Sequence, residues 1–227
     1  MLNVKCSQSI FLVYYKGMII TYHGGLFTKL QFSDTIVALN PVSKQSSLRQ
    51  TRFGSTIALS SLAHADTNGF EQVTYGDKEP FMATGPGEYE VAGTFIKGFG
   101  SESNYKGEKH INTIYTITLE GMHVCVLGAH STKELPEEAL EAIEEVDILF
   151  VPVGEGTLDP KDAYKLAFSL EPKLIIPLVL DDREYTTTLK AFLKEAGKEV
   201  KAIDKLTLKK KDLEGKRGEV VVLDAVE

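Results

Sequence analysis

The chain has few cysteines and no long apolar run. Only Cys6 and Cys125 occur among its 227 residues, and Cys125 lies in the apolar run 123–127, where a thiol behaves as a small hydrophobic group. This composition implies no disulfide framework, so the sequence predicts a reducing compartment, the cytoplasm. The apolar run 10–15 is too short to cross a membrane, and no small-residue cleavage pattern follows it. Neither a signal peptide nor a membrane partner is expected.

An excess of positive charge is also missing. The chain has 25 Lys and Arg against 32 Asp and Glu, which gives a formal net charge of -7. Nonspecific nucleic-acid binding depends on cations that displace counterions from phosphates, so neither a nucleic-acid partner nor a nucleic-acid-processing activity is expected. The one basic run, 209–217, contains Asp212 and Glu214 and is interpreted as a solvated turn. A small-molecule ligand and a homo-oligomer remain as partners, and the sequence does not decide between oligomeric states.

The composition is that of a globular chain. Apolar residues make up 43% and charged residues 25%, which is enough to bury a continuous core and excludes a disordered or collagen-like chain. The length fits one domain better than two. Residues 18–22 would make a natural opening strand, so we assign a single domain to residues 18–227 and interpret residues 1–17 as an N-terminal extension.

Short runs rich in β-branched and aromatic residues fill the first half of the chain and predict strands. These runs are 10–15, 18–22, 27–32, 35–39, 56–59, 80–83 and 94–97. A hairpin with one buried face is predicted over 113–127, because residues 113–118 alternate between apolar and polar and Glu120-Gly121 provides a turn.

Helices alternate with strands in the second half of the chain. Helical spacing of apolar residues predicts helices over 135–146, 159–169 and 185–196, with Asp159 as an N-cap and Gly197 as a stop signal. Strands are predicted over 147–151, 173–178, 200–203, 206–208 and 220–223. Strands first and alternation afterwards predict an α/β fold in which two sheets face each other and helices cover their outer faces.

One segment has the spacing of a metal-binding turn. Residues 60–68, Ser-Ser-Leu-Ala-His-Ala-Asp-Thr-Asn, directly follow the predicted strand 56–59 and align with the pattern His-x-His-x-Asp-His. In that pattern a single tight turn presents four ligands to two adjacent metal ions. His64 and Asp66 match the pattern in kind, whereas Leu62 and Thr67 occupy the other two positions.

At these residues the chain resembles the metallo-β-lactamase superfamily, in particular the branch similar to L-ascorbate-6-phosphate lactonase. Five segments carry the resemblance in order: Ile-Thr-Tyr-His-Gly at 20–24, Gly-Pro-Gly-Glu-Tyr-Glu-Val at 85–91, Asn-Thr-Ile-Tyr at 112–115 leading to Leu127-Gly128, Asp-Ile-Leu-Phe-Val-Pro-Val-Gly at 147–154, and Lys-Leu-Ile-Ile-Pro at 173–177. The resemblance implies a four-layer αββα sandwich whose metal site lies at the rim between the two sheets. It also implies a metal-dependent hydrolase.

The other ligand positions that the resemblance implies are not filled by ligands. The third family His should follow the strand that ends near Gly98, where residues 99–104 contain none. The bridging Asp that follows Leu-Gly is Ala129 here, and the last His, two residues after the late-strand proline, is Val179. Of seven family positions, only those of His64 and Asp66 keep a ligand.

A catalytic zinc ion typically needs three protein ligands and a water, and a bound ion is what lowers the pKa of that water from about 16 to about 7. Two residual ligands make a poor site, so we expect a hydrolase-like protein with a degenerate active site and no bound metal, which acts by binding or assembly. The alternative is a hydrolase of a small lactone or phosphorylated substrate, with one zinc, manganese or iron ion on His64 and Asp66 and with Glu102 and His130 as substitute ligands. His64 next to Asp66, and His130 in its loop, also have purely structural interpretations.

Other polar residues receive structural interpretations. His23 and His123 lie on or beside predicted strands and are interpreted as hydrogen-bonded structural residues. The run 85–87, Gly-Pro-Gly, lacks the context of a phosphate-binding loop and predicts a turn. Asp181 and Asp182 follow the late strand, at the sheet edge that faces ligands in parallel α/β folds, although most such acidic pairs are only solvated.

Overall fold

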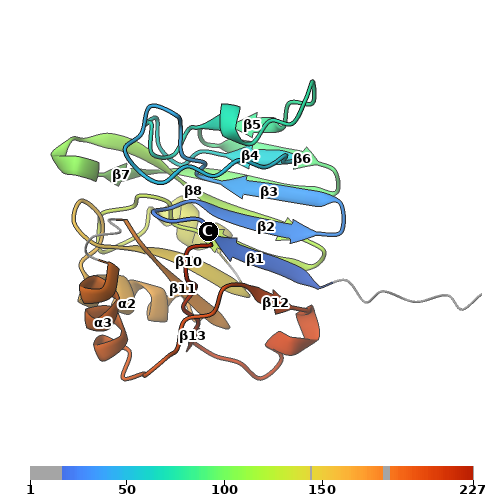
Figure 1. The fold of residues 1–227 in the computed structure, drawn as a ribbon. Coiled ribbons are helices and arrows are strands. Elements are labelled where there is room, and N and C mark those ends of the chain that lie inside the picture. Colours follow the sequence, from blue (N-terminus) through green and yellow to red (C-terminus); the bar gives the residue numbers. More distant parts are fainter. Residues whose placement is uncertain (1–16, 144, 181–184, 227) are drawn as a thin grey trace, which may run out of the picture.

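The computed structural model describes residues 17–143, 145–180 and 185–226, and its framework is two β-sheets (Figure 1). The six-stranded sheet has the order β12 (Leu206–Leu208), β1 (Met18–Tyr22), β2 (Thr28–Phe32), β3 (Thr35–Leu39), β4 (Ile57–Leu59) and β5 (Phe81–Ala83). The seven-stranded sheet has the order β13 (Glu219–Val220), β11 (Leu174–Val179), β10 (Ile148–Val153), β9 (Met122–Val126), β8 (His110–Leu119), β7 (Thr94–Ser103) and β6 (Gly87–Val91).

The main core lies between the two sheets. Strand alternation sends every second side chain of β10 into it: Ile148 and Phe150 pack against the six-stranded sheet, whereas Leu149, Val151 and Val153 face the other way. Ile20, Leu39 and Leu59 of the six-stranded sheet belong to the same inter-sheet cluster and are at most 1% exposed. Burial on both faces explains why β10 reads as a continuous apolar run rather than as an alternating one.

Helices cover the outer face of the seven-stranded sheet. They are α1 (Glu137–Ala142), α2 (Pro160–Ser169) and α3 (Tyr185–Glu195), and their apolar side chains join the outward-facing residues of β9, β10 and β11 in a second cluster (Figure 1). Asp159 caps α2 by accepting hydrogen bonds from the N–H groups of Lys161 and Asp162, as its side chain and the following proline predict. The outer face of the six-stranded sheet is covered differently, by loops and the short 3₁₀ helix η1 (Phe70–Gln72) over Phe27, Ala38 and Ala58.

The predicted fold class, an α/β sandwich of two facing sheets, is confirmed. Strands 35–39 and 206–208 and the 113–127 hairpin appear as predicted, whereas the helix predicted over 135–146 ends at Ala142. The strand predicted over 200–203 is wrong, because Ile203 makes only an isolated bridge to Leu223, and the strand predicted over 220–223 is reduced to Glu219–Val220. Run 10–15 lies outside the described residues, as does most of segment 1–17.

Two strands were underestimated because glycine and proline obscured them. β7 continues six residues past its predicted end, through Gly98 and Gly100, and an added side chain at Gly98 would meet Thr113 and Tyr115 of β8 at 2.9 and 3.0 Å. Glycine there permits close strand pairing rather than ending the strand. β10 likewise includes Pro152, which lies beyond the last β10 residue paired with β9, so its missing N–H leaves no bond unmade on that side.

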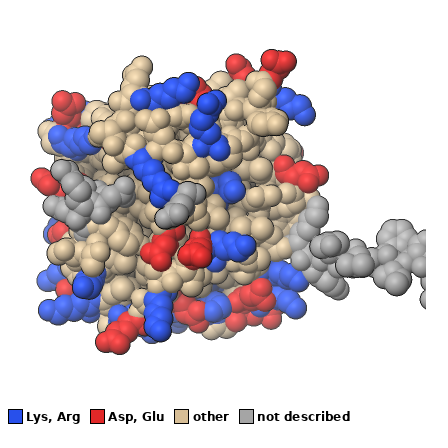
Figure 2. All heavy atoms as spheres, in the orientation of Figure 1, with Lys and Arg blue, Asp and Glu red and all other residues tan. Residues whose placement is uncertain are grey.

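The basic run 209–217 was interpreted as a solvated turn, and the structure gives it a larger role. It contains the 3₁₀ helix η3 (Lys210–Leu213), and Lys210 forms an ion pair with the buried carboxylate of Asp147. On the face shown in Figure 2, Lys and Arg side chains are interspersed with Asp and Glu. None of the helices in the described part of the chain is long and apolar enough to cross a membrane.

Candidate functional site

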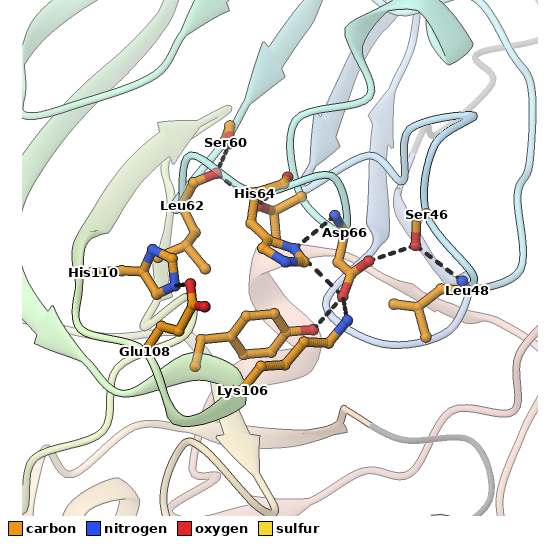
Figure 3. Close-up of polar contacts among 11 residues, drawn as sticks. Ser46, Leu48, Ser60, Leu62, His64, Asp66, Lys106, Glu108 and His110 are labelled. Carbon is orange, nitrogen blue, oxygen red and sulfur yellow. Dashed lines mark hydrogen bonds and ion pairs between the residues drawn. The ribbon is translucent and has the colours of Figure 1, made fainter.

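The turn after β4 is held together by its own side chains. The Ser60 hydroxyl donates a hydrogen bond to the Leu62 carbonyl at 2.8 Å, and the Thr67 hydroxyl donates to the same carbonyl at 2.7 Å. Thr67 occupies a position where the metal-binding pattern has a histidine, and its hydroxyl closes the turn instead of facing an ion. The turn places the side chains of His64 and Asp66 on one side (Figure 3).

His64 and Asp66 lie together, as the sequence predicted. The His64 Nδ1 atom is 3.5 Å from Asp66 Oδ2 and accepts a hydrogen bond of 3.1 Å from the Asp66 N–H. The His64 side chain is 27% exposed and the Asp66 side chain only 2%, so solvent reaches the imidazole but scarcely the carboxylate. Burial lowers the pKa of His64, and the negative charge of Asp66 partly opposes this shift.

Both oxygens of the Asp66 carboxylate are engaged by other parts of the chain. Oδ1 accepts a hydrogen bond of 2.5 Å from the Ser46 hydroxyl, and Oδ2 accepts one of 2.7 Å from the Tyr105 hydroxyl. The Lys106 ammonium is 2.6 Å from Oδ2 (Figure 3). Burial alone would raise the pKa of Asp66, but the hydrogen bonds from Lys106, Ser46 and Tyr105 lower it below its ordinary value. The carboxylate is therefore a charged, fully partnered group.

His110 completes the cluster and was missed in the sequence. It is the first residue of β8, and its ring centroid is 6.2 Å from that of His64, in an edge-on arrangement (Figure 3). Its Nε2 atom is 3.8 Å from the Glu108 carboxylate. His110 lies six residues beyond 99–104, the segment where the resemblance placed the third ligand, and just before the predicted strand 113–118, so a histidine in this connection was the signal in the sequence.

The two proposed substitute ligands do not join His64 and Asp66. Glu102 is exposed on β7, with its neighbours Ser101 and Ser103 on the opposite face of the strand. His130 is fully buried, and its Nδ1 and Nε2 atoms lie 3.1 Å from the hydroxyls of Ser101 and Thr132. In the part of the chain that the structure describes, no three His, Cys, Asp or Glu side chains are placed to share a metal ion.

Apolar core residues stand at three of the other positions where the family pattern has ligands. Leu62 and Ala129 belong to the main core cluster and are 1% and 0% exposed, and Val179 is 1% exposed. Gly128 beside Ala129 has a φ of 63°, and a side chain there would meet Asn112 and Ser61 at 2.5 Å. The rim is thus a tightly packed surface.

Two buried asparagines hold this rim. The Asn112 side-chain amide donates to the Leu127 carbonyl at 2.9 Å, and its oxygen accepts from the Ala129 N–H at 2.8 Å. The Asn40 oxygen accepts from both the N–H and the hydroxyl of Ser61. The ends of β3, β4, β8 and β9 are therefore fixed relative to one another by polar side chains.

The donor set does not suit the metal ion that the fold family implies. A carboxylate already bound to an ammonium and two hydroxyls, a histidine that accepts a backbone N–H, and a second histidine 6.2 Å away between ring centroids provide no common centre. Asp181 and Asp182, also considered from the sequence, lie outside the described residues.

His23 and His123 lie away from the His64 and Asp66 cluster, in different surroundings. His23 is buried beside Phe27 and Phe53, with ring centroids 4.9 and 5.3 Å away, and burial lowers its pKa to about 4. His123 is exposed on β9, and its Nδ1 is 3.2 Å from the Thr118 hydroxyl. His123 is hydrogen-bonded, as predicted, whereas His23 has its Nε2 atom 3.4 Å from the Thr21 hydroxyl and no hydrogen-bond partner for Nδ1 among the described residues. The run 85–87 bends the chain into β6, where the Gly85 carbonyl accepts a hydrogen bond from Tyr89.

Comparison with known proteins agrees with the architecture. The family model described as "Beta-lactamase superfamily domain" matches residues 19–179. A candidate Zn-dependent hydrolase of the metallo-β-lactamase superfamily from Thermotoga maritima is 26% identical, with a TM-score of 0.70, and the match covers 91% of this chain and 98% of that one. A candidate metal-dependent hydrolase from Parabacteroides distasonis is 17% identical, with a TM-score of 0.63 and coverage of 93% and 94%. No curated protein matches the chain significantly in sequence.

Proposed function

The chain belongs to the metallo-β-lactamase superfamily, and we propose that it is a non-hydrolytic member that acts by binding or assembly. One observation carries the proposal: Leu62, Ala129 and Val179 replace ligands at the rim and are buried apolar residues. A donor atom cannot be supplied there by a change of side-chain rotamer. It would require a different residue and a different packing of the core.

The energetics of metal binding support the same conclusion. A divalent ion loses hydration when it enters a protein, and about three protein ligands are needed to offset that loss at a catalytic zinc site. Here His64 and Asp66 remain, and the Asp66 carboxylate is already neutralised by Lys106 at 2.6 Å. Without an ion that activates water, the chain's own residues orient and hydrogen-bond a ligand but do not form the hydroxide that this family's hydrolysis requires.

We propose that the ligand contacts the partly exposed histidines of the rim. His64 and His110 have side chains that are 27% and 20% exposed, and they lie beside the exposed Glu108 carboxylate. The resemblance to the lactonase-like branch makes small lactones and phosphorylated sugar acids the first ligands to test. The low cysteine content supports a cytoplasmic location.

One observation favours the alternative, a hydrolase with an altered one-metal site. The approach of His110 to His64 brings a second imidazole to the rim, and imidazole is a common ligand of zinc, manganese and iron. Glu102 and His130 do not contribute to such a site, so the alternative needs His64, Asp66 and His110 to rearrange around an ion. Metal content therefore separates the two functions.

The test is elemental analysis of the full chain purified without chelator, combined with assays on γ-butyrolactone and p-nitrophenyl phosphate. We expect far less than one zinc, manganese or iron ion per chain, and no turnover above buffer with any of the three added. A near-stoichiometric ion that disappears in both His64→Ala and Asp66→Ala would refute the proposal and establish the one-metal hydrolase. The exposed His123→Ala serves as the matched control.

A further inference from the structure

We propose that the Lys106 ammonium is a built-in cation that takes the place of a metal ion at Asp66 and keeps divalent cations out of the native site. This inference deepens the proposed function and depends on it in one respect, which is that the native chain holds no stoichiometric metal. It names Lys106 as the residue that excludes the metal ion. Loss of Lys106 should convert a site that rejects zinc into one that binds it.

The position of the ammonium supports this role. Asp66 is the acidic residue of the turn after β4, and its side chain is only 2% exposed. A carboxylate in such a place requires a partner of opposite charge, because an unpaired buried charge is strongly destabilising. Lys106 supplies that partner at 2.6 Å, and Tyr105 binds the same oxygen, so the side of the carboxylate available to a cation is already filled.

The backbone is arranged to deliver this lysine. Lys106 has φ 54° and ψ 29°, in the left-handed region that non-glycine residues rarely adopt. Gly156, in the loop after β10, packs against the same turn, and a side chain there would meet the backbone nitrogen of Lys106 at 2.9 Å. In this conformation the Lys106 ammonium lies against the buried Asp66 carboxylate.

Nearby donors would become available without the lysine. His64 Nδ1 is 3.5 Å from Asp66 Oδ2, and the His110 ring lies next to the His64 ring (Figure 3). The ammonium repels a divalent cation from this group at close range and also blocks one carboxylate oxygen. Replacing Lys106 by an uncharged residue of similar length frees Asp66 Oδ2 beside His64, and a zinc ion would bind there once the His64 and His110 rings turn toward it. One carboxylate and two imidazoles are a ligand combination typical of zinc sites.

The experiment compares Lys106→Met with wild type and with Lys109→Met, a matched change at an exposed lysine of the same loop. The melting temperature of each full chain is measured with EDTA and with added ZnCl₂, and Co²⁺ absorption reports ligand geometry. We expect Lys106→Met to melt below wild type in EDTA. Zinc at about 100-fold excess over its Kd should then raise its melting temperature by roughly 5 to 10 °C. Wild type and Lys109→Met should show no zinc response.

Two further variants keep the inference open to refutation if Lys106→Met folds poorly. Lys106→Arg retains the charge and should remain unresponsive to zinc, whereas Lys106→Met/Asp66→Asn removes both charges and should recover stability without gaining zinc binding. A folded Lys106→Met that ignores zinc while wild type also holds no metal would overturn the inference and leave the proposed function intact. Stoichiometric metal in wild type would instead refute the proposed function.

Discussion

Asp66 and Asp147 are two buried carboxylates that the fold neutralises in different ways. Asp147 precedes β10, is 0% exposed, and binds the ammonium groups of Lys173 and Lys210 at 2.7 and 2.5 Å together with the His123 N–H at 2.9 Å. Asp66 follows β4 and has one lysine and two hydroxyls. In both cases burial alone would raise the pKa of the carboxyl, and hydrogen bonds from the partners lower it.

The surroundings of the two carboxylates differ more than their chemistry. The partners of Asp147 come from β9, the residue before β11, and η3, so the cluster ties the second half of the chain together. The Asp66 cluster includes two partly exposed histidines and a lysine whose backbone has a positive φ. The first arrangement is explained by stability alone. The second keeps polar groups accessible at the rim between the two sheets.

The largest expected effect tests this comparison directly. Asp147→Ala should lower the free energy of unfolding by about 3 kcal/mol and Asp66→Ala by about 2 kcal/mol, since Lys106 is 52% exposed and can rehydrate more easily than Lys173 at 31%. Urea unfolding at pH 7 measures both. Glu171→Ala, which breaks an exposed ion pair with Arg217, is the control and should cost less than about 1 kcal/mol.

The same variants have a predictable pH dependence. Because the folded-state pKa of each carboxyl is lowered, its stabilising contribution is present above the unfolded value near 3.9 and is lost as the pH falls through the folded value. The gap between wild type and each Asp→Ala variant should therefore narrow below pH 4. A gap that stays constant down to pH 3 would mean that packing, rather than charge, is lost in the variants.

His23 is a buried titratable group of a third kind, because cations rather than an opposite charge surround it. Burial first, and then Lys29 and Arg49, lower its pKa to about 4, so it is neutral in the folded state and takes up a proton on unfolding below about pH 6.5. Its contribution to stability is complete above pH 6.5 and falls toward pH 4. His23 should account for about 2 kcal/mol of the stability that wild type loses between pH 7 and pH 5. His23→Phe, which can stack on Phe27 and Phe53, should therefore lose about 2 kcal/mol less than wild type over this interval.

Most of the framework could be predicted from the sequence, because short-range patterns determine it. The alternation in 113–118 and the apolar run of β10 specify which faces are buried, and Asp159 with Pro160 specifies where α2 begins. β6 was missed because its residues alternate between exposed and partly exposed positions at a sheet edge. Hydrophobic pattern carries little information at such an edge.

The site could be predicted only in part, because three separate loops build it. The proximity of His64 and Asp66 follows from their spacing on one turn. Two other contacts of Asp66 are remote in the sequence: Tyr105 lies 39 residues away from it and Ser46 lies 20 residues away. No local pattern indicates either contact. Leu62, Ala129 and Val179 stand at positions where the family pattern has ligands, and the sequence alone identifies them as residues without a metal-binding side chain. The ion pair between Lys106 and Asp66 joins residues 40 positions apart, so no local pattern of the sequence indicates it.

The smallest expected effect concerns His64, which is either a structural partner of Asp66 or a group available to a ligand. If His64 only supports the turn, His64→Ala removes one acceptor for the Asp66 N–H and should cost about 1 kcal/mol, half of what Asp66→Ala costs. The exposed His123→Ala should cost still less. A His64→Ala loss as large as that of Asp66→Ala would place the histidine inside the charge network rather than at its edge. The two buried carboxylates would then differ less than their exposure indicates, and the imidazole would be a structural partner of Asp66 rather than a group available to a ligand.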